Sequence, residues 1–169
     1  MIGIDLVFIK FGNIELTCLN VVCWGTGFQM VSRIGTGRAA EEVAAELAKV
    51  WAAHYGWPYQ VIMGQGPEFT GSLFQVMLGE HGVIARLIDA RSPWQNGRTE
   101  RGGQAVKPIS DKVIEDKSAL TIDEFDMTTQ ASFISFALQC LMCVSKWESM
   151  VDISNRLNSA TENKFASQL

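Results

Sequence analysis

The sequence predicts a single α/β domain built on a mixed β-sheet, and three observations lead to this prediction. Residues 2–33 contain three consecutive segments rich in Ile, Val, Leu and Phe, separated by glycine-containing turns, as in an antiparallel meander. Helical and strand-like segments then alternate up to residue 88, which is the pattern of an α/β sheet. The segments that follow are helical, so we expect the order βββαβαβ followed by helices.

The first three strands are expected at residues 2–9, 14–23 and 28–33. Glycine and asparagine at residues 12–13 and glycines at 25 and 27 supply the turns between them. Two later strands are expected at residues 59–63 and 83–88, where short apolar runs resemble buried strands. Together these segments predict a five-stranded mixed sheet.

The first helix is expected at residues 39–55, because apolar side chains recur there at helical spacing. Gly56-Trp57-Pro58 ends this helix. After the fourth strand, residues 64–67 form a glycine-bearing loop, and a second, shorter amphipathic helix is expected at residues 72–81.

Two further helices are expected beyond the fifth strand, and they flank the sheet. The first runs from about residue 98 to 115 and contains Gly102-Gly103, each of which is expected to cost it about 1 kcal/mol. The second, at residues 122–146, is apolar. We expect one domain over residues 1–150 and a polar tail, poorly ordered, over residues 151–169.

The charge distribution limits the strength with which the domain can bind nucleic acid. The chain carries a formal net charge of −4, whereas domains that wrap nucleic acid usually present a basic face. Between residues 86 and 117, seven basic residues stand against five acidic ones. Any affinity for nucleic acid is therefore expected to be modest, local and sensitive to salt.

The cysteines predict a reduced, intracellular protein. Cys18, Cys23, Cys140 and Cys143 lie in apolar surroundings, and no signal peptide pattern is present. Cys140 and Cys143 have the spacing of half a zinc site, but no second pair follows, so a buried helix face is the simpler interpretation. The longest apolar run, residues 133–144, is too short to span a membrane.

Three segments resemble motifs of a known family. They are Gly3-Ile4-Asp5-Leu6, Met63-Gly64-Gln65-Gly66-Pro67-Glu68-Phe69-Thr70 and Ser92-Pro93-Trp94-Gln95-Asn96-Gly97-Arg98-Thr99-Glu100-Arg101. In this order and spacing they resemble the DDE-type integrase catalytic core of retroviruses and long-terminal-repeat retrotransposons, which has the ribonuclease-H-like fold. The resemblance extends over about two thirds of the chain and implies that fold here.

The family's middle acidic residue is missing. Its pattern places an Asp in the first strand, an Asp after the fourth strand and a Glu in the following helix, with 35 residues between the last two acids. Here 35 residues also separate position 64 from Glu100, but position 64 is glycine. By resemblance, Asp5 and Glu100 are the catalytic, metal-binding residues and Gly64 occupies the position of the absent Asp.

The missing carboxylate implies weakened binding of Mg²⁺ or Mn²⁺ and impaired catalysis. These cations favour hard oxygen ligands, and two of them about 4 Å apart can stabilise the attacking and leaving oxygens of a phosphodiester. Gly64 supplies no side-chain oxygen. Gln65 offers only a neutral amide oxygen, and Glu68 lies further along a different backbone direction, so we expect neither to restore the site.

The resemblance also implies which residues meet DNA. Gln95, Asn96 and Gly97 are expected in a mobile loop beside the site, and Arg101, Gln104 and Lys107 are expected along the long helix. A solvated helix face is an equally good interpretation of the basic residues on that helix.

Three hypotheses of function remain open. The first, which we favour, is the catalytic-core domain of a retrotransposon integrase that binds element ends and target DNA but is catalytically impaired. The second is an active strand transferase with an altered metal site. The third is a non-enzymatic dimerisation or interaction module that uses the helix at residues 122–146. No membrane or small-molecule cofactor is expected, and the resemblance implies action in the nucleus.

Overall fold

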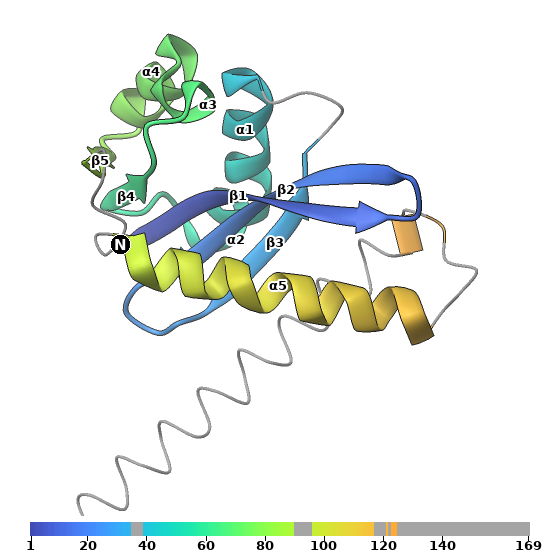
Figure 1. Ribbon diagram of the computed structural model, residues 1–169. Coiled ribbons are helices and arrows are strands. Elements are labelled where there is room, and N and C mark those ends of the chain that lie inside the picture. Colours follow the sequence, from blue (N-terminus) through green and yellow to red (C-terminus); the bar gives the residue numbers. More distant parts are fainter. Residues whose placement is uncertain (35–38, 90–95, 117–120, 122, 125–169) are drawn as a thin grey trace, which may run out of the picture.

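The computed structural model describes residues 1–34, 39–89, 96–116, 121 and 123–124. These residues form a mixed sheet with helices on both faces (Figure 1). The sheet has five strands in the order β3-β2-β1-β4-β5. Their bounds are β1 Ile2–Phe11, β2 Ile14–Cys23, β3 Gln29–Arg33, β4 Gln60–Met63 and β5 Ile84–Leu87.

The pairing of the strands confirms the predicted mixed sheet. The β1, β2 and β3 strands form the antiparallel meander expected from the glycine turns. The β4 strand pairs in parallel with β1, where Ile2 lies opposite Val61 and Gly3 opposite Ile62, and it pairs in parallel with β5. Parallel neighbours need a crossover connection, which the helices between β3, β4 and β5 provide.

One face of the sheet is covered by the helices that precede and follow β4. The predicted first helix is α1 (Ala40–Leu47), which continues through a π-helical turn (Ala48–Ala52) into α2 (Ala53–Tyr55). Gly56, with φ of 75°, ends it in a conformation that favours glycine. The second helix is α4 (Ser72–Glu80). A short helix, α3 (Pro67–Thr70), begins inside the segment that we expected to be a loop.

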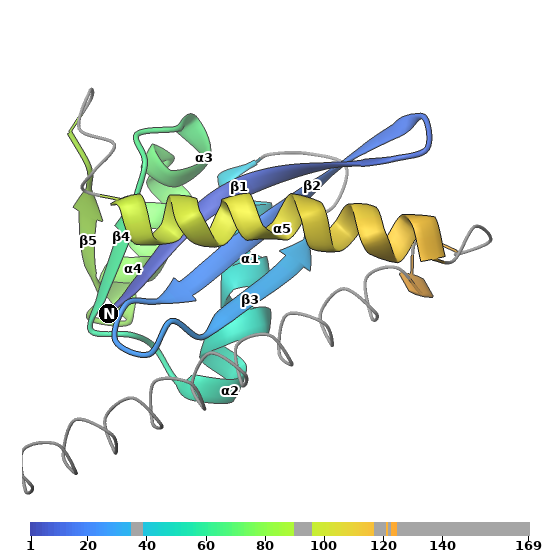
Figure 2. The same cartoon turned by 60° about the horizontal axis from the view of Figure 1, so that its bottom comes forward.

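The opposite face is covered by α5 (Gly97–Asp116), which lies across β1 and β2 (Figure 2). Side chains of a strand alternate between the two faces, so β1 and β2 contribute to two cores. Ile2, Ile4, Leu19 and Val21 pack with α1 and α4, whereas Val7, Ile9, Leu16 and Cys18 pack with Val106 of α5. Of the cysteines expected in apolar surroundings, Cys18 is buried in this core and Cys23 is half-buried.

The two adjacent glycines of α5 allow this helix to approach the sheet closely. A Cβ atom at Gly102 would lie 2.8 Å from Val22 Cγ2, and one at Gly103 would lie 3.3 Å from Val7 Cγ2. Such distances are shorter than ordinary van der Waals contact, so larger residues would push the helix outward. The cost in helix propensity that we expected from Gly102-Gly103 is thus accompanied by closer packing of α5 against β1 and β2.

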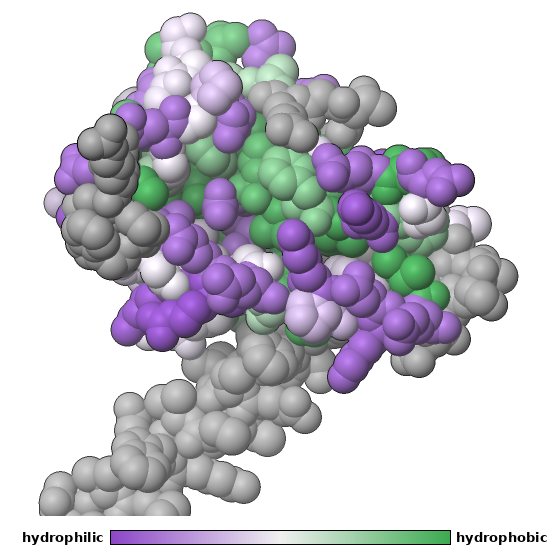
Figure 3. Space-filling model, in the orientation of Figure 1, coloured by the Kyte–Doolittle hydropathy of each residue, from purple (hydrophilic) through white to green (hydrophobic). Residues whose placement is uncertain are grey.

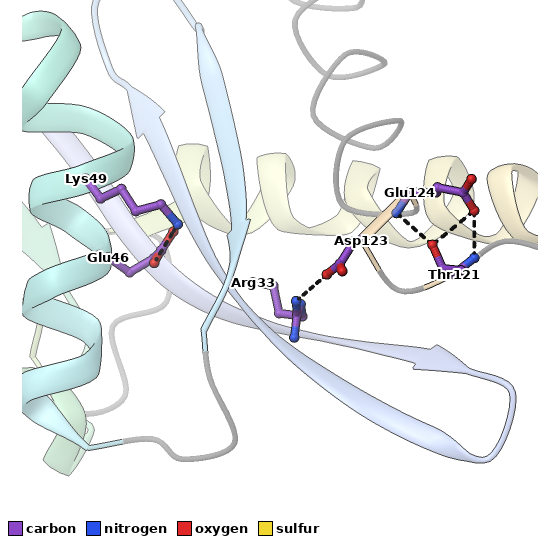
Figure 4. A network of polar contacts seen from close by, with 6 residues as sticks. All are labelled: Arg33, Glu46, Lys49, Thr121, Asp123 and Glu124. Atoms are coloured by element: carbon purple, nitrogen blue, oxygen red, sulfur yellow. Dashed lines mark hydrogen bonds and ion pairs between the residues drawn. The ribbon is translucent and has the colours of Figure 1, made fainter.

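Polar contacts lie along α1 and beside β3, and only some of them are exposed (Figure 4). Lys49 Nζ lies 3.2 Å from Glu46 Oε1 on α1, and the Ser32 hydroxyl of β3 donates a hydrogen bond to the same oxygen. Arg33 pairs with Asp123 at 3.3 Å. Thr121 and Glu124 cap each other reciprocally, since each backbone N–H donates to the other side chain. Exposed pairs of this kind contribute only about 0–1 kcal/mol each.

Several predictions fall outside the described residues. They concern most of the apolar helix at residues 122–146, Cys140, Cys143, the polar tail and Gln95. Within the described part of the chain, no helix is both long enough and apolar enough to cross a membrane.

Candidate functional site

Asp5 lies in the middle of the central strand, on the face that α5 covers. Its neighbours two and four residues along β1, Val7 and Ile9, belong to the core beneath α5, and strand alternation places Asp5 on the same face. Asp5 is half-buried. Side chains of α5 can therefore approach the Asp5 carboxylate.

Glu100 stands in the first turn of α5 and is also half-buried. Asp5 and Glu100 line one open groove of about 320 Å³. The same groove is lined further along α5 by Gly103, Gln104 and Lys107, and along β1 by Leu6, Val7 and Phe8. The structure thus brings the two predicted catalytic carboxylates together with two of the predicted DNA-binding side chains.

The outer surface of α5 is hydrophilic, as Figure 3 shows for the band of side chains along this helix. Arg101, Gln104 and Lys107 are all exposed there. Gln104 and Lys107 line the groove, whereas Arg101 does not and donates from Nε to the carbonyl of Gly97 at 3.1 Å. The groove therefore has a carboxylate end at Asp5 and Glu100 and a basic end at Lys107.

Asn96 and Gly97, which we expected in a mobile loop beside the site, are placed differently in the structure. Gly97 is the first residue of α5, so it belongs to the helix and not to the loop. The Asn96 side chain is only 3% exposed, so in this arrangement it does not offer the surface contact to DNA that we expected. Its Oδ1 atom is buried without a hydrogen-bond partner among the described residues. Gln95 lies outside the described residues.

The pKa of the Asp5 carboxyl is raised above the ordinary aspartate value, and burial is the main cause. The Leu6 N–H donates to Asp5 Oδ1 at 2.9 Å and lowers the pKa in part. The negative charges of Glu100 and Glu68 raise it further. A bound cation would relieve these unfavourable interactions, because it favours the ionised carboxyl.

Replacing Asp5 with Asn is expected to stabilise the metal-free protein near neutral pH, because the folded state then no longer holds a disfavoured charge. Below the ordinary aspartate pKa, Asp5 is protonated in both the folded and unfolded chains and has no effect. As the pH rises towards the raised value, the unfolded chain ionises first, so the folded state loses stability. Urea unfolding of Asp5→Asn and the unaltered chain at about pH 7 and about pH 3 measures this difference.

The exposed Asp111 of α5 provides the matched control, since Asp111→Asn should change the free energy of unfolding little at either pH. A stabilisation by Asp5→Asn that is equal at both pH values, or a loss of stability near neutral pH, would contradict the assigned effect of the Asp5 charge.

Gly64 directly follows β4, which ends at Met63. The parallel register pairs Gly3 with Ile62, so its continuation by two residues would bring position 64 beside Asp5. Strand alternation would then give both positions the same side. A Cβ atom at Gly64 would meet no atom within 4 Å, so a side chain at this position has free space next to it.

Gln65 and Glu68, the two side chains considered as replacements for the missing carboxylate, have different surroundings. Gln65 is exposed and donates from Nε2 to the Ile88 carbonyl at 2.9 Å. Glu68, in the first turn of α3, folds its carboxylate back over Gly66, where a Cβ atom would lie 2.5 Å from the Glu68 carboxyl carbon. Its charge acts on Asp5. Glu68 therefore lies closer to the site than the direction of the backbone after Gly64 led us to expect.

The donor set fits one divalent cation and not a bridged pair. Carboxylate oxygens of Asp5 and Glu100 are ligands that Mg²⁺ and Mn²⁺ favour, and Mg²⁺ commonly binds through one or two carboxylates plus water. A pair of cations needs further shared oxygens. Among the described residues, no group of three or more His, Cys, Asp or Glu side chains is placed to hold a metal ion.

A buried polar layer that was not predicted from the sequence lies beneath the first turn of α5. Asn20 and Gln29, on β2 and β3, are 0% and 6% exposed, and Thr99 of α5 is 0% exposed. Trp24, after β2, donates from Nε1 to Thr99 Oγ1 at 3.1 Å. The available signal was a polar residue, Asn20, at a core-facing position of an apolar strand.

Neither the family models nor the curated proteins that were compared match this sequence. Solved structures match its fold. A chain of the simian T-cell lymphotropic virus intasome, solved with PP2A regulatory subunit B56 gamma, aligns with a TM-score of 0.71 and 19% identity over 76% of this chain and 46% of that chain. This chain thus spans about half the length of the intasome chain.

The integrase catalytic core domain of HTLV-2 in complex with magnesium is similar in two forms. Its trimeric form aligns with a TM-score of 0.66 and 17% identity over 76% of this chain and 80% of that chain. Its dimeric form gives 0.65 and 17% over 76% and 81%. The present chain therefore has the ribonuclease-H-like fold of retroviral integrase catalytic cores, as the sequence motifs predicted.

Proposed function

We propose that this chain is a DNA-integration domain, the catalytic core of a retrotransposon integrase, that binds DNA but is impaired in metal-dependent strand transfer. One observation carries the proposal. Asp5 and Glu100 line a single groove that continues to Gln104 and Lys107, on the fold of an integrase core, while the residue that directly follows β4 is Gly64.

The groove supplies some of the groups that strand transfer needs. A divalent cation, when bound, stabilises charge that develops on the oxygens of a phosphodiester. Asp5 and Glu100 would bind that cation, and Lys107 would contact a DNA phosphate. Gly64 contributes no oxygen, so a second cation lacks a charged ligand, and we expect strand transfer to be slow.

The DNA-binding part of the proposal predicts a specific loss in Lys107→Ala. Lys107 is exposed and lines the groove, so its substitution should weaken DNA binding and reduce the slope of log affinity against log salt by about one. Fluorescence anisotropy with a branched DNA over a series of salt concentrations measures both quantities.

Lys112 is the matched control, because it is an exposed lysine on the same helix that does not line the groove. Lys112→Ala should retain the salt dependence of the unaltered chain. Equal losses in Lys107→Ala and Lys112→Ala would indicate general attraction to the helix, and no binding of DNA by the unaltered chain would overturn the proposed function.

Glu68 supports a second candidate function, an active strand transferase with an altered metal site. Its carboxylate lies over Gly66 and its charge acts on Asp5, so it is the available substitute for the missing acid. This alternative predicts Mn²⁺-dependent strand transfer by the unaltered chain that is lost in Glu68→Gln as well as in Asp5→Asn. Activity that survives Glu68→Gln would exclude it.

The interaction-module hypothesis stays a prediction, because the helix at residues 122–146 lies largely outside the described residues. The HTLV-2 catalytic core is solved in dimeric and trimeric forms, and homodimerisation of this chain is a proposal that light scattering at increasing concentration would test. Action in the nucleus on element ends and target DNA belongs to the same proposed function.

A further inference from the structure

Buried and part-buried hydrogen bonds connect the first turn of α5 to the sheet. Gln29 Nε2 donates to Asn20 Oδ1 at 2.6 Å, and Asn20 Nδ2 donates to the Thr99 carbonyl at 3.3 Å. Thr99 Oγ1 accepts from Trp24 Nε1 at 3.1 Å. The two amides thus connect β3 and β2 to the residue that directly precedes Glu100.

This polar layer differs from the packing around it. Apart from Asp5, β1 and β2 offer apolar residues such as Val7 and Cys18 to α5 on this face, and apolar contacts are not directional, so they do not fix the rotation of a helix. Hydrogen bonds are directional, since they weaken steeply with misalignment. A buried amide that loses its partner is destabilising, so only a narrow range of helix positions keeps the Asn20 amide satisfied.

The glycines of α5 fit this arrangement. A Cβ atom at Gly102 would lie 3.3 Å from Gln29 Nε2, and one at Gly103 would lie 3.7 Å from Asn20 Nδ2. Gly102 and Gly103 therefore let α5 approach the sheet beside the amide pair. This contact lies one turn along the helix from Thr99 and Glu100.

We infer that Asn20 and Gln29 are positioning residues that fix the rotation and register of α5, and thereby hold Glu100 opposite Asp5 across the groove. The inference rests on the proposed function only in assigning Asp5 and Glu100 a joint role in binding a divalent cation. Neither amide lines the groove, so both act through the helix.

Three variants separate positioning from stability. In Asn20→Leu/Gln29→Met both amides become apolar groups of similar size, a change that can leave stability nearly unaltered because no unpaired partner side chain remains. In Asn20→Gln/Gln29→Asn the amides exchange lengths and the hydrogen-bonded pair is retained. Gln75→Met on α4 is the control, because Gln75 is a half-buried amide that donates to the Phe69 carbonyl at 2.6 Å, away from α5.

Two measurements on the full chain report the result. The ¹⁹F resonance of Trp24 in protein labelled with 5-fluorotryptophan, assigned with Trp24→Phe, reports how the first turn of α5 sits against Thr99. Electron paramagnetic resonance of free Mn²⁺ gives the affinity of the site. In Asn20→Leu/Gln29→Met the Trp24 resonance should shift or broaden and Mn²⁺ affinity should fall about tenfold, as when a group that orients a metal ligand is removed.

The exchanged pair should return both measurements towards the values of the unaltered chain, and Gln75→Met should change neither. An unchanged Trp24 resonance together with unchanged Mn²⁺ affinity in a folded Asn20→Leu/Gln29→Met variant would overturn the inference. If that variant does not fold, Gln29→Met is measured alone, because it keeps the hydrogen bond from Asn20 to the Thr99 carbonyl. An unchanged Trp24 resonance together with unchanged Mn²⁺ affinity in Gln29→Met would then overturn the inference. An unaltered chain that binds no Mn²⁺ would overturn the proposed function, whereas the Trp24 resonance would still decide whether the amides position α5.

Discussion

Replacing Gly64 with Asp is expected to raise metal-dependent DNA strand transfer about a hundredfold or more above that of the unaltered chain. Position 64 directly follows β4, where continuing the register of β4 with β1 would bring it beside Asp5, and a Cβ atom there meets no other atom within 4 Å. We therefore expect the new carboxylate to lie beside Asp5 without displacing its neighbours. The expected size follows because misplacing a reacting group by 1 Å already costs about a hundredfold.

The assay is the reversal of strand transfer on a branched DNA, with Mg²⁺ and with Mn²⁺, since a single branched molecule places all reacting ends together. Gly64→Asn is the matched control, because Asn has the size and shape of Asp but offers only a neutral oxygen. We expect Gly64→Asn to be as slow as the unaltered chain. Asp5→Asn in the Gly64→Asp protein should abolish the gain.

Stability gives an independent measure of the same substitution. Without metal, Gly64→Asp adds a carboxylate near Asp5, Glu68 and Glu100, so its melting temperature should be lower than that of Gly64→Asn. Mn²⁺ should raise the melting temperature of Gly64→Asp more than that of Gly64→Asn, because a ligand that binds only the folded state stabilises it.

Each result of the activity assay has a separate meaning. Strand transfer by the unaltered chain at the rate of Gly64→Asp would show that the site works without a carboxylate at position 64, and Glu68→Gln would then test its substitute. Inactive Gly64→Asp that nevertheless binds Mn²⁺ more tightly than Gly64→Asn would place the defect outside the metal site. Inactive Gly64→Asp without that gain in affinity would contradict the assignment of position 64.

The order of strands and helices along the chain could be predicted because local patterns determine it. The β2 strand covers the predicted residues 14–23, since Gly12-Asn13 and Gly25-Thr26-Gly27 define both of its ends. The resemblance to integrase cores implied a joint role for Asp5 and Glu100, and both line one groove. Turn chemistry and hydrophobic periodicity act over a few residues, and such information is present in the sequence.

The features that escaped prediction depend on contacts between distant segments. Gly66-Pro67 was interpreted as a loop, although proline at the first position of a helix, followed by Glu68, also begins α3. The Asn20 and Gln29 pair depends on the register of β2 with β3 and on the helix that covers them. Asn96 could be assigned to a surface loop from its motif, but its burial follows from the position of α5.

Gly3→Ala is expected to lower the free energy of unfolding by about 2–3 kcal/mol, because it overpacks the contact between β1 and the first turn of α5. A Cβ atom at Gly3 would overlap the Thr99 hydroxyl and lie 2.5 Å from Trp24 Nε1. Thr99 is fully buried and hydrogen-bonded to Trp24, so neither side chain can move away without breaking that bond. Urea unfolding of Gly3→Ala beside the unaltered chain measures the loss.

Gly79→Ala is the control for the general effect of replacing glycine with alanine. Gly79 lies in α4, where a Cβ atom meets nothing within 4 Å, so alanine should stabilise the protein by about 0.5–1 kcal/mol. If Gly3→Ala lowers the free energy of unfolding and Gly79→Ala raises it, the destabilisation comes from the contact between position 3 and Thr99 and not from backbone entropy. A Gly3→Ala variant as stable as Gly79→Ala would contradict the close approach of α5 to β1.

The double variant Gly3→Ala/Thr99→Ala tests whether the overlap with Thr99 is the cause. Thr99→Ala removes the hydroxyl that the new Cβ would meet, and alone it should cost about 1 kcal/mol through the lost hydrogen bond. Residues in direct contact couple by about 0.5–3 kcal/mol, so the double variant should be more stable than the sum of the single effects allows. Since Glu100 follows Thr99, Gly3→Ala should also weaken Mn²⁺ binding, and the double variant should recover part of that loss. Additive effects on both stability and Mn²⁺ affinity would instead mean that alanine at position 3 acts on the strand itself and leaves the position of α5 unchanged.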